Sequence, residues 1–211
     1  MGLGDRVKRL EVTLLLTAVA SLVLSSEMAR AREYRLGVIL GAGSASITVQ
    51  PVSVSQGPLQ AGLLAESPVA DALAVSLEHR RSLKLSPLSS DISFTNAILR
   101  WYPWGQAWPR ENPETEDVSE NTWNQNRFAV YLGGGPGLAS GGVTQKLSTG
   151  SAYISGSALS LSLQAGVDYT WGTRIVRVGL DHESSLSGAS LSATSVSACL
   201  MWRIGPGNAG L

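Results

Sequence analysis

The sequence contains few cysteines and histidines and no net charge, and each shortage excludes a class of function. Its 211 residues include one cysteine, Cys199, which excludes an intramolecular disulfide and any multi-cysteine metal site. The 16 basic and 16 acidic residues balance, so the chain has no electrostatic footprint for nucleic acid. Only His79 and His182 could supply imidazole chemistry. We therefore expect no cofactor, no metal and no nucleic-acid partner.

The amino-terminal segment has the parts of a secretory signal peptide. Three basic residues between positions 6 and 9 precede an apolar run at 12–24, VTLLLTAVASLVL. The run is short for a membrane span, and Ala29-Arg30-Ala31 offers a small-x-small cleavage site after it. We expect cleavage after Ala31 and export of residues 32–211 as one domain. No later segment is apolar and long enough for a membrane helix, so the exported chain would be periplasmic, secreted or an outer-membrane barrel.

The stretch ALSLSLQAGVDYTW at 158–171 shows strict alternation of apolar and polar residues. Side chains on a β-strand alternate between faces, so this pattern predicts a strand with one apolar and one polar face. The apolar face ends in Tyr169 and Trp171, and the polar face carries Asp168. In a soluble sandwich the apolar face would meet a second sheet, whereas in a membrane barrel it would meet lipid.

Similar runs recur along the chain, separated by clusters of Gly, Ser, Pro or Asn. The eight predicted strands are 34–47, 58–66, 72–81, 92–102, 127–139, 158–171, 174–182 and 192–204. In the fourth, Ile92 and Phe94 are out of phase with the later residues, which suggests a bulge. An even number of strands near ten residues each is typical of tilted membrane strands.

The aromatic residues favour the membrane barrel. If both termini lie at one end, the aromatics of several strands gather at that rim, as a girdle at a membrane interface would and as a sandwich core would not. This predicted girdle comprises Tyr34, Trp101, Tyr102, Phe128, Tyr169, Trp171 and Trp202. We therefore predict an all-β fold, an eight-stranded antiparallel up-and-down transmembrane β-barrel.

The polar registers of the same strands carry charged side chains, which we expect to form an ion-pair network inside the barrel. They are Arg35, Glu78, Arg80, Arg100, Asp168, Arg177, Asp181 and Arg203. Eight strands leave an interior just wide enough for side chains to fill, which favours a packed core over an open pore. A narrow channel for small solutes stays as an alternative.

Three longer segments resemble a known family. They are LQAGLLAESPVADALAVSLEHRRS at 59–82, NAILRWYP at 96–103 followed by RFAVYLGGGPGLA at 127–139, and SLQAGVDYTWGTRIVRVGLDH at 162–182. Each is similar to part of the small outer-membrane β-barrel domain of Gram-negative bacteria, the OmpA/OmpX-like family. The resemblance implies a cell outer-membrane location, contact with outer-membrane lipid and lipopolysaccharide, and assembly by machinery that recognises an aromatic-rich last strand.

The sequence departs from that family in two places. Near its end, Cys199 stands where glycine is usual, Ile204 replaces the usual terminal phenylalanine, and GPGNAGL follows. The joint between the fourth and fifth strands, usually a tight periplasmic turn, holds an acidic and tryptophan-rich insertion at about 103–126. This insertion is either a solvated loop or a docking segment for a periplasmic partner.

One arrangement suggests catalysis. His182 and Ser184 share a strand face on the last hairpin, which is similar to the outer-membrane lipid A 3-O-deacylases (PagL-like), where serine attacks an ester and histidine takes its proton. No acid follows Glu183, which points to the opposite face, so the third member of such a triad is missing from its usual place. We therefore favour a non-enzymatic barrel with an envelope structural role or a surface-loop role. Its surface loops would be 50–56, 83–90, 140–156 and 184–190.

Overall fold

The computed structural model describes residues 34–49, 52–57, 59–70, 72–83, 91–104, 128–147, 150–171, 174–188 and 190–204. The regular elements in these ranges are β1 (Tyr34–Val49), β2 (Val52–Gln56), β3 (Leu59–Ala70), β4 (Leu73–Ser82), β5 (Asp91–Trp101), β6 (Phe128–Leu147), β7 (Gly150–Trp171), β8 (Arg174–Gly188) and β9 (Ser190–Ile204). Within this part of the chain, no helix has the length and apolar character to cross a membrane. The predicted signal peptide, its cleavage site and nearly all of the 103–126 insertion lie outside the described residues.

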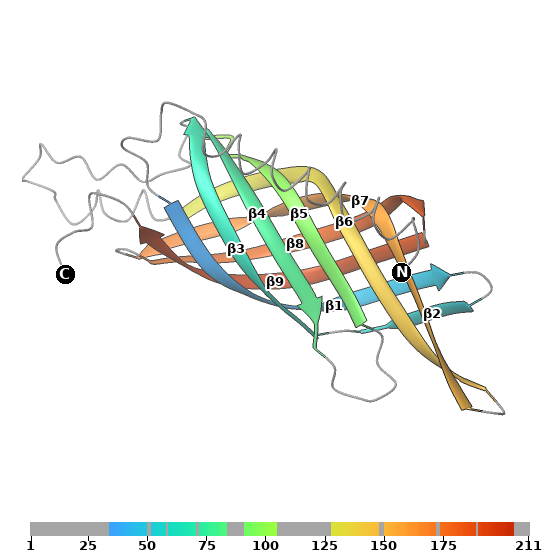
Figure 1. Cartoon of the computed structure of the whole chain (residues 1–211). Helices are drawn as coiled ribbons and strands as arrows, with labels where there is room; N and C mark the ends of the chain where they lie inside the picture. Colours follow the sequence, from blue (N-terminus) through green and yellow to red (C-terminus); the bar gives the residue numbers. More distant parts are fainter. Residues whose placement is uncertain are drawn as a thin grey trace, which may run out of the picture.

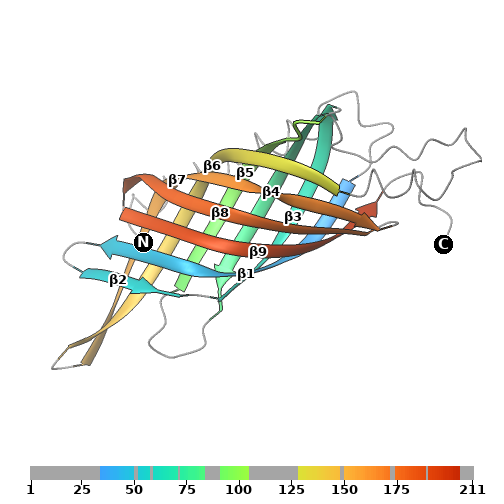
Figure 2. The same cartoon turned by 180° about the vertical axis from the view of Figure 1, so that it is seen from behind.

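The strands form one closed antiparallel barrel. They follow the order β2-β1-β3-β4-β5-β6-β7-β8-β9, and β9 returns to pair with β1 from Tyr34↔Ile204 to Thr48↔Ser190. β2 pairs only with the outer part of β1, so the other eight strands make the wall (Figures 1 and 2). The predicted fold class is confirmed. We call the rim with Tyr34 and Ile204 the terminal end, and the opposite rim, where β6 turns into β7, the hairpin end.

Burial alternates along each strand as the period of two requires. On β9, Val196, Leu200 and Trp202 face outward and are exposed, whereas Cys199 and Met201 face inward and are buried. Toward the hairpin end the interior is apolar and is filled by Ala45, Ile92, Phe94, Ala139, Leu191 and Ala193. The remainder of the interior holds the charged side chains together with neutral polar and apolar ones such as Asn96 and Met201.

The predicted bulge in the fourth strand is wrong. β4 and β5 pair in regular register from Leu73↔Trp101 to Arg81↔Ser93, and Ile92 and Phe94 point inward in phase with Arg100. They look out of phase in the sequence because the interior changes from charged to apolar along the strand. The register shifts occur elsewhere, between Pro68 and Ala70 and between Leu159 and Ser160.

Three of the predicted surface loops are largely strand. β6 and β7 continue through most of 140–156, β8 extends to Gly188, and β2 occupies 52–56. Backbone pairing such as Val143↔Ile154 satisfies the backbone N–H and C=O groups whatever the side chains are. The Ser-, Thr- and Gly-rich composition of these segments therefore did not prevent strand formation. Figure 1 shows the β6–β7 hairpin projecting well past β3, β4 and β5. Nearly all of the predicted loop at 83–90 lies outside the described residues.

Candidate functional site

The first candidate site is the charged interior. The structure places seven of the eight predicted interior charges inside the barrel, each no more than 3 % exposed: Arg35, Glu78, Arg80, Arg100, Asp168, Arg177 and Asp181. The eighth, Arg203, is half-buried near the end of β9. Burying an isolated charge costs much free energy, so the role of this interior depends on how its charged side chains are paired.

Glu66 on β3 is the hub of the network on the terminal side. Its carboxylate accepts hydrogen bonds from Arg35 at 2.9 Å, Arg100 at 2.7 Å and Arg177 at 2.9 and 3.1 Å, which come from three different strands. Glu66 is not among the predicted interior charges, because it stands at the very end of the predicted strand 58–66. The alternation along the strand does place Glu66 inside. Its side chain lies on the same face as the buried Gln60 and on the opposite face from the exposed Leu63.

A second group of contacts continues toward the hairpin end. Glu78 accepts from Arg80 at 2.8 Å and from Gln164 at 2.9 Å, and it also pairs with Arg100. Arg80 lies 3.0 Å from Asp181 across the barrel. Because β4 and β8 are separated by three strands around the wall, this pair spans the interior. A further bond of 2.6 Å joins Asn96 on β5 to Glu183 on β8.

The predicted placement of Tyr102 in the girdle is wrong. Tyr102 follows the last residue of β5 and turns inward, where it is 1 % exposed. Its hydroxyl donates to Asp168 at 3.0 Å and accepts from Arg177 at 3.0 Å. With these two hydrogen bonds the phenol completes the network at the terminal end.

Tyr131 fills the interior beside this network. Its ring lies under two guanidinium groups, 4.7 Å from that of Arg177 and 5.4 Å from that of Arg100. A methyl group at Gly166 would lie 2.7 Å from the Tyr131 hydroxyl, and one at Gly179 would collide with that hydroxyl. The two glycines, which are cross-strand partners, thus provide the space that the tyrosine occupies.

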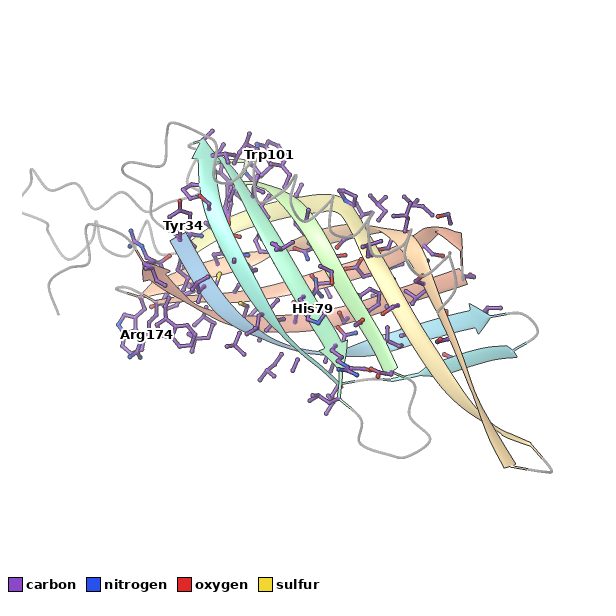
Figure 3. The ribbon with its side chains drawn as sticks, in the orientation of Figure 1. Tyr34, His79, Trp101 and Arg174 are labelled. Carbon is purple, nitrogen blue, oxygen red and sulfur yellow. The ribbon has the colours of Figure 1, made fainter. Side chains whose placement is uncertain are left out.

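The second candidate site is the outer surface of the barrel at its terminal end. Trp101, Phe128, Trp171 and Trp202 are exposed there, Tyr34 and Tyr169 are half-buried, and Trp104 is 73 % exposed beside them. Phe128 and Tyr169 lie against each other with ring centroids 4.8 Å apart. Figure 3 labels Tyr34 and Trp101 at this end of the molecule. Apart from Tyr102, the structure places the predicted girdle residues on the outer surface.

The histidines lie on the same outer surface, farther toward the hairpin end. His79 and His182 each make a 2.9 Å hydrogen bond to a threonine on the next strand, Thr95 and Thr194 respectively. Ser184 faces outward like His182, but the hydrogen bond shown for the imidazole goes to the threonine. Glu183 faces inward. Among the described side chains the only outward-facing carboxylate is Asp91, which binds Arg81, so no acid orients His182.

The described residues are poorly arranged to bind a metal ion or to supply a nucleophilic thiolate. No group of three His, Cys, Asp or Glu side chains among them is arranged to hold a metal. Cys199 is buried against Ile39, Leu64, Ile175 and Met201. Burial of this kind suits a small apolar filler rather than a reactive group.

Comparison by sequence finds no family model and no curated protein that matches the chain. Comparison by structure finds Neisserial surface protein A, with 12% identity and a TM-score of 0.50 over 81% of this chain and 97% of that one. OprG of Pseudomonas aeruginosa has 13% identity and a TM-score of 0.49 over 83% and 97%, and Ail of Yersinia pestis has 12% and 0.46 over 82% and 99%. The likeness to Neisserial surface protein A agrees with the closed eight-stranded barrel fold of this chain.

Proposed function

We propose that this chain is a non-enzymatic integral protein of the bacterial outer membrane, with a filled barrel as its anchor and β-hairpins presented outside the cell. In this orientation the terminal end faces the periplasm, and the projecting β1–β2 and β6–β7 hairpins face outward. The role would be structural support of the envelope or binding of a partner at the cell surface. The proposal rests on the exposed apolar surface, the filled interior and the hairpin end of the barrel.

The observation that carries the proposal is the inverted distribution of side chains. Leu40, Leu63 and Leu180, from three strands, are 59%, 65% and 59% exposed on the outer surface. Arg35 and Arg100 are 1% exposed in the interior. Soluble monomers rarely expose apolar patches larger than a few hundred Å², whereas a membrane barrel needs an apolar band around its whole circumference. The exposed aromatics at one border of this band have the position of an interfacial girdle.

The filled interior supports an anchor rather than a pore. Arg100 extends from β5 to Glu66 on β3, Ser76 and Glu78 on β4, and Gln164 on β7. Together with the contacts of Arg80 and Arg177, it closes the middle of the barrel with paired charges. We expect no steady ion conductance when the purified protein is added to a planar lipid bilayer. Stable single-channel currents would favour the narrow channel instead.

The hairpin end supports a role in binding. β2 pairs with β1 alone, and beyond Gly142 the only partner of β6 is β7, so both hairpins present unpaired strand edges among the described residues. Such edges can pair with an extended segment of another protein. Figure 2 shows both hairpins projecting from the same end of the barrel.

Two experiments test the proposal. Protein refolded in detergent should show β-rich circular dichroism and a gel mobility that changes on heating, and a monomer stable without detergent would contradict it. An epitope inserted between β6 and β7 should bind antibody on intact cells, whereas one inserted between β7 and β8 should bind only after permeabilisation. The reverse pattern would contradict the orientation.

A further inference from the structure

Arg174 is unusual among the charges of the barrel. The buried charged side chains pair with one another inside, and the outward-facing Arg81 binds Asp91 through two hydrogen bonds of 3.0 and 2.7 Å. Arg174 opens β8 at the terminal end, faces outward and is exposed. Of the outward-facing charged side chains that the structure describes, it alone has no partner of opposite charge among the described residues. In Figure 3 it points away from the barrel, at the end that also bears Tyr34.

Two tryptophans flank this arginine. Arg174 is the cross-strand partner of Trp171 on β7 and of Trp202 on β9, and both indoles are on the outer surface, 66% and 41% exposed. Directly opposed residues of an antiparallel sheet have their Cβ atoms about 5 Å apart. The three side chains therefore stand in a row across three neighbouring strands, with the cation between two indoles.

The row lies at the border of the apolar band. Toward the hairpin end, the outward register of β8 continues with Val176, Val178 and Leu180, all exposed. Tryptophan prefers the level of the lipid headgroups, where its ring is in the apolar region and its N–H meets polar groups. A guanidinium at that level can donate two parallel hydrogen bonds to a phosphate.

We propose that Trp171, Arg174 and Trp202 form a binding site for the phosphate of an anionic phospholipid in the periplasmic leaflet. The guanidinium binds the phosphate, and the two indoles contact the glycerol region on either side of it. This site rests on the proposed function, since it requires the barrel to lie in a membrane with its terminal end at the leaflet that contains phospholipid.

Native mass spectrometry tests the site. Full-length barrel is reconstituted in nanodiscs of equal phosphatidylglycerol and phosphatidylethanolamine, and the lipids that stay bound on release are counted. One cation near a membrane surface corresponds to about a fivefold preference for anionic lipid. We expect the wild type to retain phosphatidylglycerol in about that excess, Arg174→Gln to lose the excess, and Arg174→Lys to keep part of it. Arg81→Gln, the matched loss of an outward arginine at the other end, should leave it unchanged.

The outcomes separate the site from the proposed function. The blue shift of tryptophan emission on mixing with vesicles reports insertion for every variant. If all variants insert but Arg174→Gln retains the same excess of phosphatidylglycerol, or if the wild type shows no excess, this site is wrong and the membrane barrel stands. If no variant inserts, the proposed function fails as well.

Discussion

Arg177 holds Asp168 through two hydrogen bonds of 2.7 Å, one from Nε to Oδ1 and one from Nη2 to Oδ2. The two residues are cross-strand partners on β8 and β7, and both face the interior. The same guanidinium reaches Glu66 on β3 and the hydroxyl of Tyr102. One arginine therefore connects two adjacent strands to β3, which is separated from β8 by β9 and β1.

Arg177→Met should lower the free energy of unfolding by about 3–5 kcal/mol, because it leaves two buried carboxylates without their shared cation. Urea titration of the refolded barrel, followed by gel mobility, measures the loss. The double variant Arg177→Met/Asp168→Leu should recover part of it, since one of the uncompensated charges is then removed. Arg174→Met, which removes an exposed arginine three residues earlier, should change the stability little. Equal losses at 174 and 177 would contradict the network.

Val178 tests the apolar band at its middle, since it lies halfway along β8 between Arg174 and His182 and is 52% exposed. Val178→Arg should destabilise the barrel in lipid vesicles by about 2–4 kcal/mol, the cost of a cation near the bilayer midplane. Val178→Leu should be nearly neutral. Ser192→Arg, outward on β9 beyond the band, should cost less than about 1 kcal/mol, because its depth is interfacial. Equal tolerance of arginine at 178 and 192 would mean that this surface does not contact lipid.

Gly179 should not accept a side chain. A methyl group there would collide with the Tyr131 hydroxyl and approach the carbonyl of Ala165 at 3.2 Å, so Gly179→Ala should cost about 1–3 kcal/mol by overpacking. Adding Tyr131→Phe should restore part of the loss, because it removes the atom that the methyl meets first. At the outward-facing Gly134 the nearest atoms would be 3.2 and 3.3 Å away, so Gly134→Ala serves as the milder control. Chemical denaturation of the wild type and these three variants compares them directly.

Ser184→Ala should have no effect on lipid A. The imidazole of His182 bonds to Thr194 and has no orienting acid among the described residues, so we expect the serine to behave as a surface residue with a stability change within about 0.5 kcal/mol. Mass spectrometry of lipid A from cells that express the wild type or Ser184→Ala should give identical acylation patterns. Loss of a 3-position acyl chain with the wild type alone would instead establish the esterase.

The alternation of side chains was sufficient to predict the barrel, because most of the outward positions that the structure describes are apolar or small. It failed where the rule that apolar residues face lipid and polar residues face the interior does not hold. Ile92 and Phe94 are apolar yet face inward, since the interior itself becomes apolar toward the hairpin end. The alternation of residues along one strand cannot show that the interior changes from charged to apolar along that strand.

Tyr102 and Glu66 show a second limit, which concerns partners rather than faces. Composition and position place Tyr102 at the aromatic rim, but its hydroxyl turns inward to Asp168 and Arg177, which come from strands far along the sequence. Glu66 likewise becomes the hub only because three arginines from other strands converge on it. Such convergence depends on strand register and barrel closure, which the sequence of one strand does not specify.

The seam between β1 and β9 joins the first and the last strand through fifteen residue pairs, from Tyr34↔Ile204 to Thr48↔Ser190. The other strands of the wall pair with the next wall strand along the chain, so those hairpins can form in turn, whereas the seam has the largest loop-closure entropy and must wait for the last strand. Until it forms, two strand edges have unsatisfied backbone groups, which hydrocarbon does not tolerate. Synthesis that stops before Ser190 therefore yields an open sheet that cannot close in a membrane, rather than a smaller barrel.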